Sequence, residues 1–328
     1  VKTIPGVVGA MVALTAEKKG GGMEAPVPPR PVSPAAPRPA PQAAAPRPAP
    51  HAPASHSQGK RGVPGIAAII AVASGKGGVG KSTTSANLAL ALAVLGLKVG
   101  LLDADIYGPS VPKLFGLGGT RPELRDNKLV PIAKDGLSLM SIGFLVDEEA
   151  PMIWRGPMVM SAITQLLRDV AWGELDVMVV DMPPGTGDAQ LTMAQNVPLS
   201  GAVIVSTPQD LALLDARRGI AMFERVSVPI LGLVENMSYF ICPNCGTRHD
   251  IFAHGGARKE AEKMQVPFLG EVPLEMAIRE TSDGGRPIAA TEPAGPHAKI
   301  YRDIATAIRD RLSLNAGPAR PQLRIVVE

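Results

Sequence analysis

Residues 74–83, with the sequence SGKGGVGKST, combine glycines and lysines at a spacing that suits the phosphates of a nucleotide. The pattern Gly-x-x-x-x-Gly-Lys-Ser falls on Gly75, Gly80, Lys81 and Ser82. In such a loop the glycines allow successive backbone N–H groups to point at phosphate oxygens. We expect Lys81 to contact the terminal phosphates and Ser82 to bind Mg²⁺. The residues predicted to surround the phosphates are Gly75, Lys76, Gly77, Gly78, Val79, Gly80, Lys81, Ser82 and Thr83.

Three carboxylates follow apolar runs that predict strands. Asp103 and Asp105 come directly after one run, and Asp181 ends another. Because the carboxyl ends of parallel strands meet at one edge of a sheet, we expect these side chains near the phosphate-binding loop. Asp181 is predicted to hold Mg²⁺ through water, with a backbone N–H of the Pro184-Gly185 turn near the γ-phosphate. A helix N-cap or a solvated carboxylate is the alternative for each aspartate.

Apolar runs alternate with helical or turn segments from residue 65 onward. The runs that predict strands are 66–73, 99–103, 176–181, 202–206 and 230–236, and the alanine- and leucine-rich run 86–93 predicts a helix after the loop. This alternation is typical of an α/β fold with a doubly wound, mostly parallel sheet, the P-loop NTPase architecture. The content of 45% hydrophobic and 3% aromatic residues indicates a core of aliphatic side chains, which suits such a sheet.

Cys242 and Cys245, in the sequence CPNCG, are the only cysteines of the chain. Proline and glycine shape such a turn so that both sulfurs point at one metal, and the pair supplies half of a four-thiolate site. The same sulfurs suit an iron-sulfur cluster or zinc, and zinc ligation by His249 or His254 stays open at this point. The low cysteine count indicates a reducing compartment, and we expect a cytoplasmic protein.

The net positive charge of the chain comes from a stretch outside the predicted fold. Five basic residues lie in residues 28–62, a stretch without acidic residues, and without them the formal charge falls from +3 to −2. A slightly acidic body offers no general surface for nucleic acid. No apolar run reaches the roughly 18 residues that a membrane span needs. We therefore expect neither nucleic acid nor a membrane as a partner.

Composition divides the chain into four predicted segments. Residues 20–62 are rich in proline and alanine and predict a disordered linker, with a docking site for a proline-recognising protein as the alternative. Residues 1–19 contain a single extended pattern, which is too short for a stable domain. The nucleotide-binding body is predicted over residues 63–314, followed by a tail at 315–328.

Five motifs carry a resemblance to a known family. GKGGVGKST, DADIYGPS, DMPPGTGD, ENMS and CPNCG lie along residues 65–312. Together they resemble the Mrp/ApbC family of iron-sulfur cluster carrier ATPases, which is a branch of the MinD-like ATPases. The CPNCG motif separates this branch from the others.

The resemblance implies a mechanism for the nucleotide site. It implies slow ATP hydrolysis by a homodimer in which Lys76 reaches the nucleotide of the other subunit, although a solvated lysine remains the alternative. It also implies that Asp105 orients the attacking water and that Asn236 recognises adenine, since an amide offers both a donor and an acceptor. Asp103 is expected at the cofactor site because it ends a strand near the loop.

The resemblance also implies the cargo and its partners. Cys242 and Cys245 of two subunits are expected to hold a bridging 4Fe-4S cluster and to pass it to apo-proteins, with cluster scaffold proteins as further partners. Residues 1–19 look like the last strand of an iron-sulfur assembly domain that often precedes such an ATPase, and the valine start suggests that an upstream part is missing.

The competing interpretation is a MinD/ParA-like positioning ATPase with a structural zinc knuckle. Such a protein is expected to end in a membrane-binding amphipathic helix or to present a basic surface to DNA. Residues 317–328 are too short and irregular for that helix. A nitrogenase-type reductase binds its cluster through two well-separated cysteines, which differ from the pair in this chain.

Overall fold

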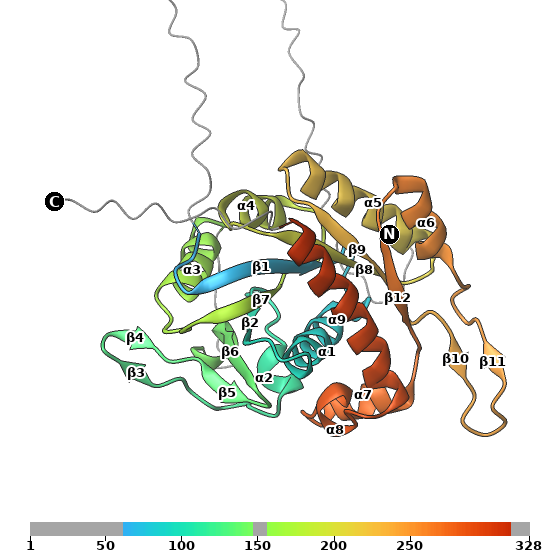
Figure 1. Cartoon of the computed structure of the whole chain (residues 1–328), viewed down its shortest axis with the longest axis horizontal. Coiled ribbons are helices and arrows are strands. Elements are labelled where there is room, and N and C mark those ends of the chain that lie inside the picture. Colours follow the sequence, from blue (N-terminus) through green and yellow to red (C-terminus); the bar gives the residue numbers. More distant parts are fainter. Residues whose placement is uncertain (1–61, 147–155, 316–328) are drawn as a thin grey trace, which may run out of the picture. The chain divides into compact units, whose positions relative to one another are not determined.

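A parallel sheet forms the centre of the protein. The computed structural model describes residues 62–146 and 156–315, and eight strands within these residues form one sheet in the order β12-β9-β8-β1-β7-β2-β6-β5 (Figure 1). β5 is antiparallel to β6, and every other neighbouring pair is parallel. The strands are β1 (Ile66–Ala73), β2 (Val99–Asp103), β5 (Ile132–Lys134), β6 (Leu137–Ser141), β7 (Leu175–Asp181), β8 (Gly201–Ser206), β9 (Ile230–Asn236) and β12 (Phe268–Val272). The predicted doubly wound, mostly parallel fold is confirmed.

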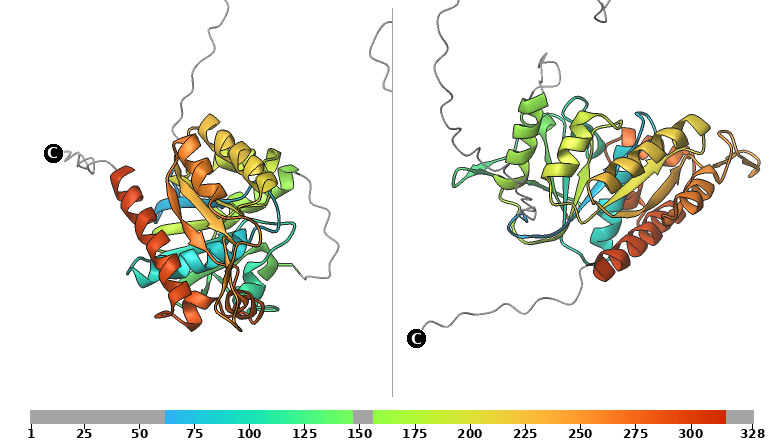
Figure 2. Two further views of the ribbon diagram at one scale, coloured as in Figure 1. Left: turned by 90° about the vertical axis from the view of Figure 1, so that its right-hand side faces the viewer. Right: turned by 90° about the horizontal axis from the view of Figure 1, so that it is seen from above.

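Helices cover both faces of this sheet. α1 and α9 pack together on one face with α8 beside them, whereas α5 and α6 pack on the other face, next to α4 and α3 (Figure 2). The helices are α1 (Lys81–Val94), α2 (Val111–Leu114), α3 (Gly156–Arg168), α4 (Asp188–Asn196), α5 (Asp210–Arg225), α6 (Gly256–Met264), α7 (Met276–Asp283), α8 (Ile288–Thr291) and α9 (Pro296–Asn315), with a 3₁₀ turn η1 (Ile142–Phe144). Two small hairpins, β3 (Leu124–Arg125) with β4 (Lys128–Leu129) and β10 (Phe240–Ile241) with β11 (Arg248–His249), lie outside the main sheet.

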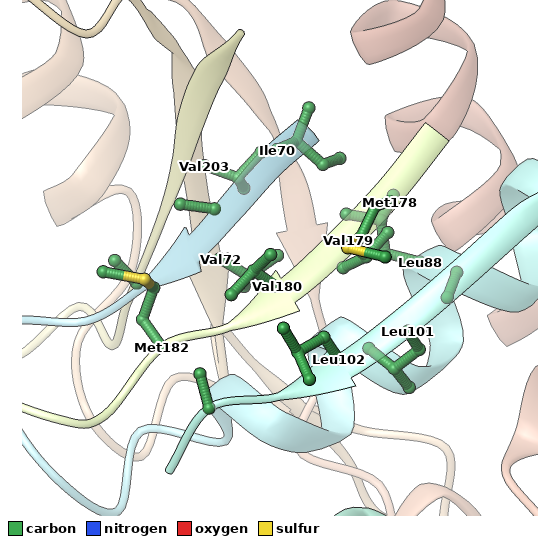
Figure 3. Packing of buried hydrophobic residues seen from close by; sticks show 14 of the residues in the cluster. Ile70, Val72, Leu88, Leu101, Leu102, Met178, Val179, Val180, Met182 and Val203 are labelled. Atoms are coloured by element: carbon green, nitrogen blue, oxygen red, sulfur yellow. The ribbon is translucent and has the colours of Figure 1, made fainter. Parts of the chain in front are cut away.

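The core is built from aliphatic side chains of the central strands and α1. Val72 of β1, Leu102 of β2 and Val180 of β7 are fully buried, and they lie close to one another in Figure 3. Leu88 of α1 is also fully buried, because α1 is covered by α9 on the side away from the sheet. Strands with both faces covered are apolar throughout their length, which explains the uninterrupted apolar runs in the sequence.

The predicted elements agree closely with the observed ones. The strands at 66–73, 99–103 and 230–236 have the predicted bounds, and β7 and β8 each begin one residue earlier than predicted. The helix predicted at 86–93 starts at Lys81, directly after the loop. Sequence reasoning missed β6 and β12, in which serine, or glycine and glutamate, interrupts the apolar pattern.

Several predicted segments lie outside the described residues. The N-terminal segment 1–19, nearly all of the linker 20–62 and the tail after residue 315 belong to this group. None of the helices within residues 62–146 and 156–315 is long and apolar enough to span a bilayer.

Candidate functional site

The loop between β1 and α1 forms a cradle for phosphate. Gly78 and Gly80 adopt φ angles of 80° and 79°, the left-handed region that favours glycine. A Cβ on Gly80 would lie 2.2 Å from Nδ2 of Asn236. α1 begins at Lys81 with neither a capping side chain nor an acidic residue in its first turn. The helix N-terminus therefore presents N–H groups and a positive dipole end to an anion, as phosphate binding requires.

Lys81 and Asp181 form a buried ion pair at this loop. The Lys81 Nζ lies 2.7 Å from Oδ1 of Asp181, and the two side chains are 6% and 0% exposed. Ser85, one turn after Lys81 on α1, donates its hydroxyl to the same Oδ1 at 2.7 Å. Lys81 also donates to the hydroxyl of Ser82 at 3.2 Å. The cation, the hydroxyl and the carboxylate predicted for the phosphate and Mg²⁺ sites thus lie together.

The second carboxylate oxygen of Asp181 fits a role at a metal. Oδ2 is buried and makes no hydrogen bond to the residues that the structure describes. A buried carboxylate oxygen without a donor is costly, and a Mg²⁺ ion with its water shell would supply the missing partner. Together with the half-buried hydroxyl of Ser82, Asp181 could hold Mg²⁺ beside the phosphates of ATP.

Asp103 organises the loop that follows β2. Its Oδ2 accepts hydrogen bonds from the backbone N–H groups of Ser110 and Val111 at 2.9 and 3.0 Å and from the Ser141 hydroxyl at 3.0 Å. Its Oδ1 accepts from the N–H of Asp105 at 3.1 Å. Burial, with the nearby Asp181 carboxylate as the second cause, raises the pKa of Asp103 to about 7. These contacts support the helix-cap alternative, and the expected contact with the cofactor stays a prediction.

Asp105 is the more accessible of the two aspartates in this loop. Its side chain is partly buried, and its Oδ1 accepts one long hydrogen bond of 3.3 Å from the N–H of Gly108. Burial raises the pKa of Asp105 above its ordinary value, while the Lys81 ammonium opposes this rise and the Asp181 carboxylate adds to it. A carboxylate with few internal hydrogen bonds near Lys81 is suited to orient water at the phosphates.

Lys76 and the turn at Pro184-Gly185 lie at the outer side of the loop. The Lys76 residue is exposed, and its carbonyl accepts a hydrogen bond from the Ser74 hydroxyl at 2.9 Å. Gly185 has a φ angle of 98° and donates its N–H to the Ser74 carbonyl at 3.0 Å. Pro184 is exposed. This N–H is therefore engaged within the chain, and its expected place at a γ-phosphate stays a prediction.

A pocket of 220 Å³ adjoins the phosphate-binding loop on the side of β9. Gly80, Thr83 and Asn236 line its inner end, and the segment 273–275 forms another wall. The Asn236 side chain donates its amide to the Val79 carbonyl at 2.8 Å. The place of the pocket beside the loop suits a nucleoside base, and the specific contact between Asn236 and adenine stays a prediction.

Cys242 and Cys245 lie away from this centre, on a projection between β9 and α6. We define residues 239–254 as the cysteine arm, which contains the β10–β11 hairpin (Figure 1). Its tip is closed by hydrogen bonds from the Cys242 N–H to the Thr247 carbonyl at 2.9 Å and from the Gly246 N–H to the Cys242 carbonyl at 2.8 Å. Both cysteines are free thiols, and Cys245 is exposed.

The tip of the arm favours thiolates but forms only part of a metal site. Hydrogen bonds from the Thr247 side chain and backbone, together with Cys242, lower the pKa of Cys245. Across the part of the chain that the structure describes, no group of three or more His, Cys, Asp or Glu side chains is arranged to hold a metal ion. His254 instead lies 3.0 Å from Glu271. The arm of one chain therefore offers two sulfurs and lacks further ligands from its own neighbourhood.

Sequence reasoning missed several residues that position the site. Ser85 could have been found, because it lies four residues after Lys81 on the same helix face. Gln190 of α4 donates to the carbonyls of Pro183 and Ser74 at 2.5 and 3.4 Å and so ties the loop at Asp181 to the phosphate-binding loop. This contact joins residues far apart in the sequence, and no local pattern indicates it.

Comparisons with known proteins agree with this geometry. Residues 65–309 match the profile of a family described as the NUBPL iron-transfer P-loop NTPase. An iron-sulfur cluster carrier protein of Pseudomonas fragi is 57% identical over 248 residues, which cover 74% of this chain and 86% of that protein. The iron-sulfur cluster transfer protein NUBPL of Mus musculus is 56% identical over 253 residues, which cover 76% of this chain and 79% of that protein.

Solved structures give the same result. A nucleotide-binding protein of Archaeoglobus fulgidus, determined in complex with ADP, is 44% identical with a TM-score of 0.62 and covers 71% of this chain and 91% of its own. The cell division ATPase MinD of Pyrococcus furiosus is 22% identical with a TM-score of 0.57, and the match covers 75% of this chain and 99% of its own. At this identity the likeness supports the fold alone. The chain therefore belongs to the NUBPL-type iron-transfer P-loop NTPase family.

Proposed function

We propose that this protein is an ATP-dependent iron-sulfur cluster carrier that assembles a 4Fe-4S cluster between two copies of the chain and transfers it to apo-proteins. The observation that carries this proposal is the cysteine arm. Its two free cysteines, Cys242 and Cys245, lie at the tip of the arm. Their sulfurs would supply half of the protein ligands of such a cluster. A second copy of the same arm supplies the other half.

The nucleotide part of the proposal is supported by the loop and the carboxylates. The helix N-terminus at Lys81 provides the phosphate site, and the free oxygen of Asp181 suits Mg²⁺. The relatives include a protein in complex with ADP, which supports ATP and Mg²⁺ as the ligands here. We propose Lys81, Ser82 and Asp181 as the residues that bind them and Asp105 as the residue that orients water.

The proposed homodimer gives the exposed lysine a function. Lys76 is exposed, as a lysine must be to reach the nucleotide of another subunit. In this arrangement ATP hydrolysis is slow and requires the homodimer. A site shared between two subunits can open when the subunits move, which suits a carrier better than a permanent holder.

A positioning ATPase with a structural zinc knuckle is the less supported function. The relatives at 56% and 57% identity are named for cluster transfer or carriage, whereas the MinD structure at 22% supports the fold alone. Zinc at the cysteines stays chemically possible, because thiolates bind both metals.

Anaerobic reconstitution with iron and sulfide tests the proposal. We expect the broad visible absorption of a 4Fe-4S cluster, an equal molar content of iron and sulfide, and loss of this absorption when an apo-acceptor takes up the cluster and gains activity. A protein that retains only zinc under these conditions, or one that never yields its cluster to an acceptor, contradicts the proposal.

A further inference from the structure

Glu235 is a fully buried acidic residue near the end of β9, and the nucleotide site does not use it directly. Its Oε1 accepts hydrogen bonds from the Ser238 hydroxyl at 2.6 Å and the Gly255 N–H at 2.9 Å, and its Oε2 accepts from the Ala257 N–H at 2.6 Å. A carboxylate that accepts three hydrogen bonds compensates the cost of its burial. The Glu235 carboxylate is therefore a fully hydrogen-bonded group rather than an isolated buried charge.

The donors to Glu235 lie on both sides of the cysteine arm. Ser238 directly precedes the arm, while Gly255 and Ala257 directly follow it. Gly255 is also the N-cap of α6, a helix with no acidic residue in its own first turn. The Glu235 carboxylate supplies the negative charge that this helix end favours and fixes the two ends of the arm to one point.

The next residue along β9 contacts the nucleotide loop. Successive side chains of a strand point to opposite sides, so Asn236 faces away from Glu235. The Asn236 amide donates to the Val79 carbonyl of the phosphate-binding loop at 2.8 Å and lines the 220 Å³ pocket. Two successive residues of β9 thus contact the pocket, through Asn236, and the residues on either side of the arm, through Glu235.

A second connection links the same pocket to the arm. The Leu274 N–H donates to the carbonyl of Tyr239, the first residue of the arm, at 2.7 Å, and Leu274 lines the pocket. The Ser238 N–H donates to the Val272 carbonyl at 3.0 Å, just before this wall. A base that fills the pocket therefore contacts elements bonded directly to the start of the arm.

We propose that Glu235 is a positioning residue that couples occupation of the nucleotide pocket to the orientation of the cysteine arm. A base in the pocket restricts the motion of Asn236 and of the wall at Leu274. Because Glu235 lies on the same strand and bonds to residues at both ends of the arm, the orientation of the arm is restricted as well. An arm held in one orientation moves less, so the exposed Cys245 and the half-buried Cys242 react more slowly with a reagent. This inference deepens the proposed function and rests on it only in taking the arm as the site of the cluster.

Alkylation of the two cysteines measures this coupling without any cluster. These 328 residues hold no other cysteine, so the mass gained with iodoacetamide reports on the arm alone. We expect saturating ADP with Mg²⁺ to slow alkylation of the reduced wild-type protein at least about fivefold, which is the lower range of allosteric coupling. ADP is used so that hydrolysis does not enter the measurement.

Glu235→Gln keeps the shape of the side chain but replaces one acceptor oxygen by a donor group. We expect this variant to bind ADP with nearly wild-type affinity and to lose the ADP-dependent slowing. Glu262→Gln is the matched control, because Glu262 is exposed on α6, and it should keep the wild-type ratio. A purely structural role of Glu235 would lower the melting temperature without changing the ratio.

Two results overturn the inference: a wild-type rate that ADP does not change, or a Glu235→Gln variant that binds ADP and keeps the wild-type ratio. If Glu235→Gln fails to fold, Ser238→Ala, which removes one of the three donors, decides the question by the same measurement. A ratio there equal to wild type contradicts the inference. Failure of cluster reconstitution with a retained ADP effect would instead contradict only the proposed function.

Discussion

The phosphate-binding loop and the cysteine arm are built in opposite ways. Around the loop, Lys81 and Asp181 are buried, pair with each other and lie where β1, β7 and α1 meet. On the arm, Cys245 is exposed at the tip of a two-stranded hairpin outside the main sheet. The loop contains its ligand groups within one chain, whereas the arm contains half of a site. We therefore propose that nucleotide binding is a property of the single chain and that cluster binding is a property of the pair.

The difference also concerns stability. A two-stranded hairpin is marginally stable by itself, so the arm depends on the contacts at its base. Glu235 provides three of these contacts from within the body. The nucleotide site, by contrast, is supported by the core of the sheet. Substitutions at the tip of the arm should therefore leave the fold and nucleotide binding unchanged.

The largest expected effect separates the two regions completely. Cys242→Ala and Cys245→Ala should each abolish reconstitution of the cluster, because one thiolate of each pair is lost, while the affinity for ATP stays unchanged. Iron content and nucleotide titration measure the two properties. Asn244→Ala, at an exposed position of the same turn, is the control and should bind the cluster as wild type does. A cysteine variant that takes up a full cluster would refute the division between the regions.

The next effect acts on the loop alone. Lys81→Ala should lower ATP turnover by about a hundredfold or more, as expected when a charged donor to a phosphate is removed from a preorganised site. Because Asp181 then loses its partner, circular dichroism must show that the variant is folded. Lys128→Ala, on the exposed β4 strand, is the control. Turnover of Lys81→Ala at the wild-type rate would exclude the proposed phosphate site.

Substitution of Lys76 separates nucleotide binding, which needs one chain, from hydrolysis, which is proposed to need two. Lys76→Ala should keep much of the nucleotide affinity and lose hydrolysis, because the exposed lysine is proposed to act on the nucleotide of the other subunit. Steady-state turnover and equilibrium ADP binding provide the two measurements. An unchanged rate of hydrolysis would favour a solvated lysine at this position.

The smallest effect is expected at the N-terminus. Deletion of residues 1–59 should leave both nucleotide binding and cluster assembly nearly intact, since a proline- and alanine-rich sequence cannot form a packed core. Nucleotide titration and iron content of the shortened protein test this. Loss of ATP binding after the deletion would show that the proposed boundary of the body near residue 63 is wrong.

The sequence predicted the loop region well because its signals are local. The glycines fix the backbone at Gly78 and Gly80, and apolar runs define β1, β2 and β9. Asp181 was expected at the metal site for the same reason, since it ends a strand. Contacts that join distant residues had no such signal. Glu235 looked like part of a strand, and only the fold brings it to the N–H of Ala257.

The arm illustrates the other limit of sequence reasoning. The pair Cys242 and Cys245 indicated a metal site and its incomplete ligand set. The sequence did not reveal that a hairpin carries this pair away from the phosphate-binding loop. The two strands of the hairpin have only two residues each, which is too short to show a periodic pattern. Asp103 gives a further example, because the hydrogen bond that it accepts from the Ser141 hydroxyl depends on β6, which the sequence did not predict.

Native mass spectrometry of the anaerobically reconstituted protein tests directly whether the cluster is shared between two chains. We expect a dimer that carries one 4Fe-4S cluster for every two chains and that becomes apo-monomer or apo-dimer when either cysteine is replaced. A monomer that carries a complete cluster, or a protein that carries only zinc, would contradict this expectation.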